Sequence, residues 1–266
     1  MGSSPPPKDY GLEAARGNIP GVSTVNKFGR NIEIDSGITA DIWDGGYTVG
    51  SGGVSLIWVA PTQARTHQIV STSADDDGDP EGVGAHTLRI WGLTGWSTAE
   101  VSEDITLNGT NNVATSNTYV IIHRMQVLTK GATNVNVGVI TATADTDSTV
   151  TAVIRAGEGA TQMAIYGVPS TQKMYMVRPY ANINRSVVSA AAVDVCLLDN
   201  PEPADELTNF RTRHTFGLQT TGTSAYTIPY GVPKIFTGPC ILKIQVSSSA
   251  NDMDVSAGFD AFLVDN

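Results

Sequence analysis

Short runs of β-branched and apolar residues recur along the whole chain, and each run is closed by turn residues. Breaks such as Asn108-Gly109, Lys130-Gly131 and Gly157-Glu158-Gly159 separate them. Thr and Val suit a pleated strand because their branched Cβ already restricts the side chain. No window carries a helical apolar stripe longer than about two turns. Roughly a dozen strands at intervals of about 8 to 20 residues predict an all-β fold, an antiparallel β-sandwich of jelly-roll type.

The N-terminal part of the chain lacks this strand pattern. Residues 1 to 45 contain Pro5-Pro6-Pro7, Pro20 and many Gly residues, without a sustained period of 2 or 3.6. We therefore expect an extended N-terminal arm over 1–45 and a β-sandwich body over 46–266. A composition break near 157–160 divides the body into two strand groups, and the pattern leaves open whether these share one core.

Charge and apolar content exclude several classes of partner. The formal net charge is -10, so binding to nucleic acid through phosphate neutralisation is disfavoured. No apolar run approaches the roughly 20 residues of a membrane helix, so we expect no membrane partner. Cys196 and Cys240 have neither metal-ligand nor multi-bridge spacing, and two buried thiols are expected rather than a disulfide.

The densest acidic cluster offers a weak metal-binding candidate. Asp75, Asp77 and Asp79 alternate along one loop, and alternating carboxylates can converge on Ca²⁺. However, Pro80 stands where an EF-hand loop needs Gly, and His86 stands where it needs a bidentate Glu. A solvated hairpin tip is the favoured interpretation.

Catalytic and cofactor signals are weak. Four histidines are scattered without metal-type spacing, and no Gly-x-Ser-x-Gly motif marks a nucleophile. We expect neither an enzyme nor a cofactor. Four tryptophans could stack on sugars, but the apolar runs around Trp58 and Trp91 favour burial in a core.

Several blocks of the chain resemble a family of structural proteins from tailed-bacteriophage virions. The blocks are Gly17–Gly21, Val25–Asn31, Ile42–Gly46, Trp91–Leu93 with Trp96, Glu103–Gly109, Met163–Pro169 and Asp254–Asp260 with Asp265–Asn266. The resemblance implies a β-rich subunit present in many copies at the capsid surface, made in the host cytoplasm. The first role that the resemblance implies is that of a capsid cement or decoration protein, which binds the major capsid protein. A tail-associated or host glycan-binding virion protein is the alternative, and the family has no catalytic residues to carry over.

A mechanism for such a role follows from the expected arm. An arm that orders on neighbouring subunits must offset about 1 to 2 kcal/mol of backbone entropy per residue. Strand addition and apolar anchoring by Ile19, Val25 and Phe28 could supply this, while Lys27 and Arg30 could pair with acidic capsid sites. A homotrimer, expected from shell geometry, would present three arms at once.

Overall fold

The computed structural model describes residues 9–46, 54–185, 190–227 and 229–266. In these ranges the chain consists mostly of strands, with one short helix, and every pairing between named strands is antiparallel. The predicted all-β, antiparallel fold class is confirmed. Within these ranges no helix is long and apolar enough to cross a membrane.

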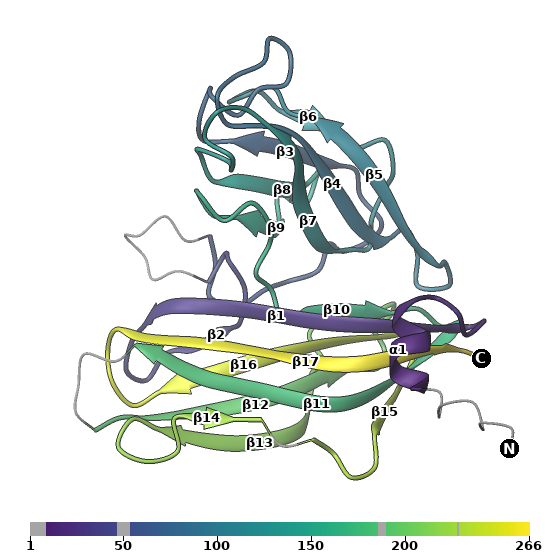
Figure 1. The fold of residues 1–266 in the computed structure, drawn as a ribbon, viewed down its shortest axis with the longest axis vertical. Coiled ribbons are helices and arrows are strands. Elements are labelled where there is room, and N and C mark those ends of the chain that lie inside the picture. The colour runs from purple at the N-terminus through teal and green to yellow at the C-terminus, as the bar shows by residue number, and fades with distance from the viewer. Residues whose placement is uncertain (1–8, 47–53, 186–189, 228) are drawn as a thin grey trace, which may run out of the picture.

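The strands form two lobes, one above the other in Figure 1. We call the lower one the base lobe. It contains α1 (Tyr10–Ala15), β1 (Val22–Ile34), β2 (Thr39–Asp41), β10 (Ile165–Val168), β11 (Gln172–Arg185), β12 (Ala192–Asn200), β13 (Arg211–Gln219), β14 (Ala225–Tyr226), β15 (Lys234–Thr237), β16 (Cys240–Ser248) and β17 (Met253–Asp265). The upper one, the inserted lobe, contains β3 (His67–Ser71), β4 (Ala85–Leu93), β5 (Glu100–Thr106), β6 (Val113–Ala114), β7 (Ile121–Lys130), β8 (Ile140–Ala144) and β9 (Val150–Ile154).

The base lobe is a sandwich of two sheets. One has the order β1-β17-β11-β14, with β15 also paired to β11, and the other has the order β10-β16-β12-β13, with β2 paired to β16. Along β17 the odd-numbered residues from Met253 to Leu263 are buried and most even-numbered ones are more exposed. This period of two is what a strand with one face on a core requires. The largest buried side chains between the sheets include Phe236 and Phe259.

The inserted lobe has its own core. A four-stranded sheet, β6-β3-β8-β9, packs against a three-stranded sheet, β5-β4-β7. Ile69, Leu88 and Ile90 are fully buried between them. Trp43, Met163, Ile165 and Ile241, from segments of the base lobe, also belong to this core cluster. The two lobes are therefore packed together through apolar side chains as well as joined by the chain.

The structure differs from the predicted arm. Residues 22–34 are extended, but they form an integral strand of the base lobe, paired with β17 from Val22↔Val264 to Ile34↔Met253. Val25 and Ile34 are buried in the base core, and Ala14 of α1 is buried as well. The sequence pattern misses this strand because Gly29 and Lys27 interrupt its inward-facing apolar positions. The first residues, 1–8, lie outside the described ranges.

The strands fall into two groups, but the first group is not one continuous stretch of the chain. The chain crosses back to the base lobe after β9, close to the predicted break at 157–160. The first group is not continuous, however, because β1 and β2 pair with β17 and β16 near the other end of the chain. The inserted lobe is thus an insertion between β2 and β10.

Candidate functional site: the junction between the lobes

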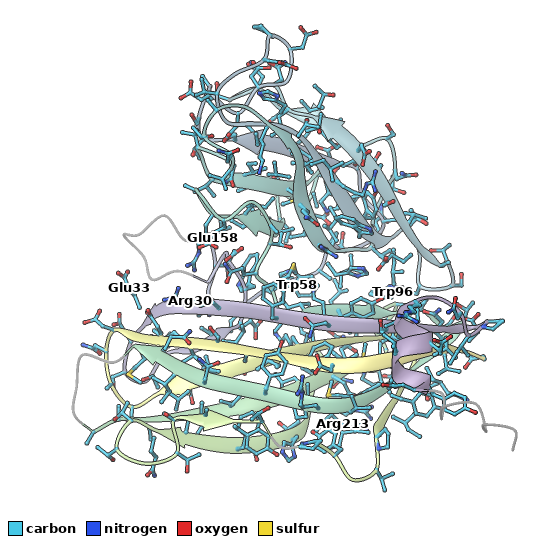
Figure 2. The ribbon with its side chains drawn as sticks, viewed as in Figure 1. Arg30, Glu33, Trp58, Trp96, Glu158 and Arg213 are labelled. Atoms are coloured by element: carbon cyan, nitrogen blue, oxygen red, sulfur yellow. The ribbon has the colours of Figure 1, made fainter. Side chains whose placement is uncertain are left out.

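Polar contacts tie the two lobes together around Asp44. Its buried carboxylate lies 3.5 Å from Nε of Arg155 and accepts a 2.7 Å hydrogen bond from the backbone N–H of Gln162. Burial raises the pKa of Asp44 to about 7, and the nearby charge of Arg155 limits the rise. A second link is the hydrogen bond from the backbone N–H of Ser170 to the carbonyl of Trp96, 2.7 Å long. Figure 2 shows Trp96 and Trp58 at the level where the lobes meet.

A cleft of about 660 Å³ opens at the same junction. One wall is β1 from Ser23 to Phe28, and the facing wall is formed by Trp91, Glu100, Arg124 and the segment 160–161. Its volume falls in the range of ordinary ligand-binding pockets, about 300 to 1,000 Å³. The cleft is the first place to look for a binding function because charged side chains line it.

Lys27 connects the two walls. Its side chain is buried, and its ammonium group donates a hydrogen bond to the backbone carbonyl of His123. Burial lowers the pKa of Lys27 to about 7, and the positive charge of Arg124 lowers it further, while Glu100 opposes the change. A strand of the base lobe therefore holds a partly neutral amine beneath the inserted lobe.

His123 lies at the centre of the cluster. Its Nε2 lies 2.5 Å from a carboxylate oxygen of Glu100, and its ring stacks on Tyr166 with centroids 4.4 Å apart. Burial lowers the pKa of His123, which leaves the imidazole neutral at neutral pH. Since a carboxylate can only accept, Nε2 carries the hydrogen and Nδ1 is left as an acceptor. Among the described residues Nδ1 has no hydrogen-bond partner.

Glu100 completes the link between the lobes. Partial burial would raise its pKa, but the hydrogen bond from His123 and the charge of Lys27 outweigh burial and lower it. The hydroxyl of Tyr166, on β10, lies 3.5 Å from the same carboxylate oxygen. Two base-lobe side chains and two inserted-lobe side chains thus form one polar cluster whose arrangement depends on both lobes.

The buried amine predicts a specific pH dependence. In the unfolded chain Lys27 has its ordinary pKa of 10.5, and in the fold its pKa is about 7. Between these values the unfolded state binds more protons, so Lys27 makes the free energy of unfolding rise as pH increases above 7. Lys27→Met should remove this contribution. Urea unfolding of both proteins at pH 7.0, about 7.7 and about 8.4 measures it.

Burial also raises the pKa of Cys240 to about 12, so ionisation of this thiol in the unfolded state lowers the free energy of unfolding at higher pH. Both proteins keep Cys240, so its contribution cancels in the difference between them. A wild-type minus Lys27→Met difference that stays constant across the pH range measured would contradict the assignment.

The five capsid-contact candidates have different surroundings. Val25 is buried in the base core, unlike the exposed anchor that was expected, and Lys27 is buried where it lines the cleft. Arg30 pairs with Asp254 of its own chain at 2.8 Å. Ile19 is half-buried. Phe28 is the candidate with substantial exposure, 50%.

Hydrogen bonds within the chain hold the acidic loop in place. Asp75 and Asp79 are exposed, and Asp77 accepts a hydrogen bond from the backbone N–H of Asp79. In the described ranges no group of three His, Cys, Asp or Glu side chains could hold a metal ion. The residue that the sequence pattern overlooked is Asp76, which is completely buried. No local signal distinguishes it from its neighbours.

The tryptophans and cysteines singled out in the sequence differ in how deeply they are buried. Trp43 and Trp58 are buried, whereas Trp91 and Trp96 are half-buried. Both Cys196 and Cys240 are free thiols; Cys240 is buried and Cys196 is half-buried. The guanidinium of Arg124 lies 4.6 Å from the ring centroid of Trp91 at the cleft.

Comparison with known proteins adds little. No family model and no curated protein matches the chain. Among solved structures, it is similar to one of infectious bursal disease virus Gt strain, with a TM-score of 0.26, 11% identity, and coverage of 97% of this chain and 78% of the other. A second, of T=1 particles derived from infectious bursal virus, has a TM-score of 0.26 and 10% identity, and the match covers 92% of this chain and 70% of the other. A third, of a VP2 subviral particle of infectious bursal disease virus, has a TM-score of 0.25 and 9% identity, and the match covers 91% of this chain and 72% of the other. Likenesses this weak establish neither a shared fold nor a shared function.

Proposed function

We propose that this protein is a non-enzymatic structural component of a tailed-phage virion, a decoration protein that binds the outer surface of the head and stabilises the shell. The observation that carries the proposal is where the virion-like sequence blocks lie in the fold. Val25–Asn31 lies on β1, and Asp254–Asp260 lies on β17, which pairs with it. Blocks at opposite ends of the chain are therefore adjacent strands.

Two further blocks, Ile42–Gly46 and Met163–Pro169, lie against each other and against β1. The backbone N–H of Ala164 donates to the carbonyl of Ile42, and Trp43 pairs with Met163. A Cβ on Gly29 would lie only 2.8 Å from the backbone nitrogen of Ala164, so this close packing of β1 requires glycine. The blocks Val25–Asn31, Ile42–Gly46 and Met163–Pro169 thus meet at the lobe junction. Their contact in the fold is what supports a structural role shared with the family.

The mode of attachment that we propose differs from a free arm. Since β1 is part of the base lobe, the capsid contact would be made by folded surfaces and by the cleft rather than by residues 1–45 as a whole. The major capsid protein is the proposed partner, and a homotrimer is the proposed assembly because shell symmetry favours closed rings. The proposal places the protein at the capsid surface.

Copy number tests this proposal. In purified source virions, quantitative mass spectrometry normalised to the major capsid subunit should give on the order of hundreds of copies per particle, because shell symmetry multiplies each surface site. About a dozen copies would instead favour the tail-associated or glycan-binding alternative. Absence from purified particles would contradict a virion role altogether.

A further inference from the structure

The strand β1 has an open edge. In its sheet it neighbours only β17, so one side of its backbone is not used by the sheet. The carbonyl of Gly21 accepts from the backbone N–H of Asp265, and that of Lys27 accepts from the hydroxyl of Tyr180 on β11. Odd-numbered residues of this stretch therefore point their backbone groups toward the sheet. Because these groups alternate along a strand, those of Thr24, Asn26 and Phe28 point the other way.

The open side faces the cleft. All six residues from Ser23 to Phe28 line it, and a strand rises about 3.3 Å per residue, so the open edge is about 20 Å long. Further along, the close packing of Gly29 against Ala164 ends the open part. Within the described residues no hydrogen bond reaches the outward backbone groups of 24, 26 and 28. A stretch of five or six residues could add to this edge as a strand.

The charges of the cleft select the kind of segment. Its charged lining residues are Lys27, Arg124 and Glu100, beside the neutral His123. Glu100 is engaged by His123 and Tyr166, whereas the amine of Lys27 has one hydrogen-bond partner among the described residues. The two basic side chains of Arg124 and Lys27 outnumber the single carboxylate of Glu100 in this lining, so the cleft favours a ligand with a carboxylate.

We propose that the open edge of β1 receives an extended polypeptide segment with an acidic side chain, which adds to the sheet as a strand and places its carboxylate toward Arg124 and Lys27. The inference rests on the proposed function, because it takes the segment to come from the shell of the same particle. Main-chain hydrogen bonds would supply affinity, and the exposed ring of Phe28 would cover the segment on one side.

A proline scan of the edge tests the backbone part. Thr24→Pro removes an outward N–H, which edge strands tolerate, while Thr24→Ala removes the same side chain and keeps the N–H. Each protein is titrated onto particles stripped of it, and bound copies are counted. We expect Thr24→Pro to bind about tenfold more weakly than Thr24→Ala, with similar melting temperatures for the two variants. Equal binding by the two variants would overturn the proposal.

A matched pair of arginines tests the charge part and does not depend on whether the proline variant folds. Arg89 and Arg124 both lie near the ring of Trp91, but only Arg124 lines the cleft. We expect Arg124→Gln to weaken particle binding about threefold and Arg89→Gln to leave it unchanged. Equal effects of the two substitutions would overturn the charge assignment.

A photo-crosslinker identifies the occupant. With Phe28 replaced by p-benzoylphenylalanine, irradiation of decorated particles should crosslink the protein to an extended segment of a shell protein with an acidic residue. A crosslink only to a second copy of this chain would overturn the proposal. If wild-type protein fails to bind particles at all, the proposed function fails. If it binds and the Thr24 and Arg124 variants bind equally well, only this inference fails.

Discussion

Removal of residues 1–34 is expected to leave a chain that cannot form the base lobe. This deletion takes away β1, and with it Val25 and Ile34 from the core. Burying one such side chain contributes about 1.5 to 3 kcal/mol, and β17 would also lose one of its two neighbouring strands. Against a total stability of about 5 to 15 kcal/mol for a typical domain, this loss is large. Circular dichroism melting and limited proteolysis measure it.

The control for this deletion is Thr24→Ala, which changes an exposed position of the same strand and should melt like the intact protein. A free arm predicts the opposite for the deletion. If the truncated chain melted cooperatively at the wild-type temperature, β1 would not be the structural strand described above.

Replacement of Asp76 by Ala should cost about 3 to 5 kcal/mol of unfolding free energy. One oxygen of the buried carboxylate accepts hydrogen bonds from the backbone N–H groups of Ala85 and Val137, both 2.8 Å long. The other accepts from the hydroxyl of Ser71 at 2.6 Å and the N–H of Gly138 at 2.8 Å. Without the carboxylate these buried donors lose their acceptor, and each unpaired donor costs about 1 to 3 kcal/mol before relaxation. Urea unfolding monitored by tryptophan fluorescence measures the change.

Asp75 provides the matched control, since it precedes Asp76 in the chain but is exposed. Asp75→Ala should change the free energy of unfolding by no more than about 0.5 kcal/mol. Equal effects of the two substitutions would mean that the loop is held by something other than the Asp76 carboxylate. The same pair separates a folding role from calcium binding, because a calcium loop would depend on the exposed carboxylates.

The candidate site could be predicted only in fragments. Phe28 and Lys27 were selected from the sequence as parts of a contact segment, and both line the cleft. The sequence does not assign Glu100 or His123 to a site, because each is a single polar residue in a strand pattern. They become neighbours only when β5 and β7 flank β4 and the inserted lobe is placed on β10.

The acidic loop illustrates the same limit in another way. The sequence shows a cluster of carboxylates but not which one points inward. That choice depends on the backbone N–H groups of Val137 and Gly138, which lie more than sixty residues further along the chain. Burial of a charge is possible only where enough donors converge on it, and convergence of distant segments is not visible in a local pattern.

The sequence by itself determined the fold class, because alternating β-branched residues and turn residues act locally and leave few alternatives to antiparallel sheets. It also predicted low helix content and a break in the chain close to where the inserted lobe ends. Only the tertiary structure decided that β1 pairs with β17, that β2 and β10 enclose an insertion, and that Lys27 lies beneath His123. These depend on pairing between distant strands, whose free energy comes from shared burial and complementary hydrogen bonds rather than from the preferences of either strand alone.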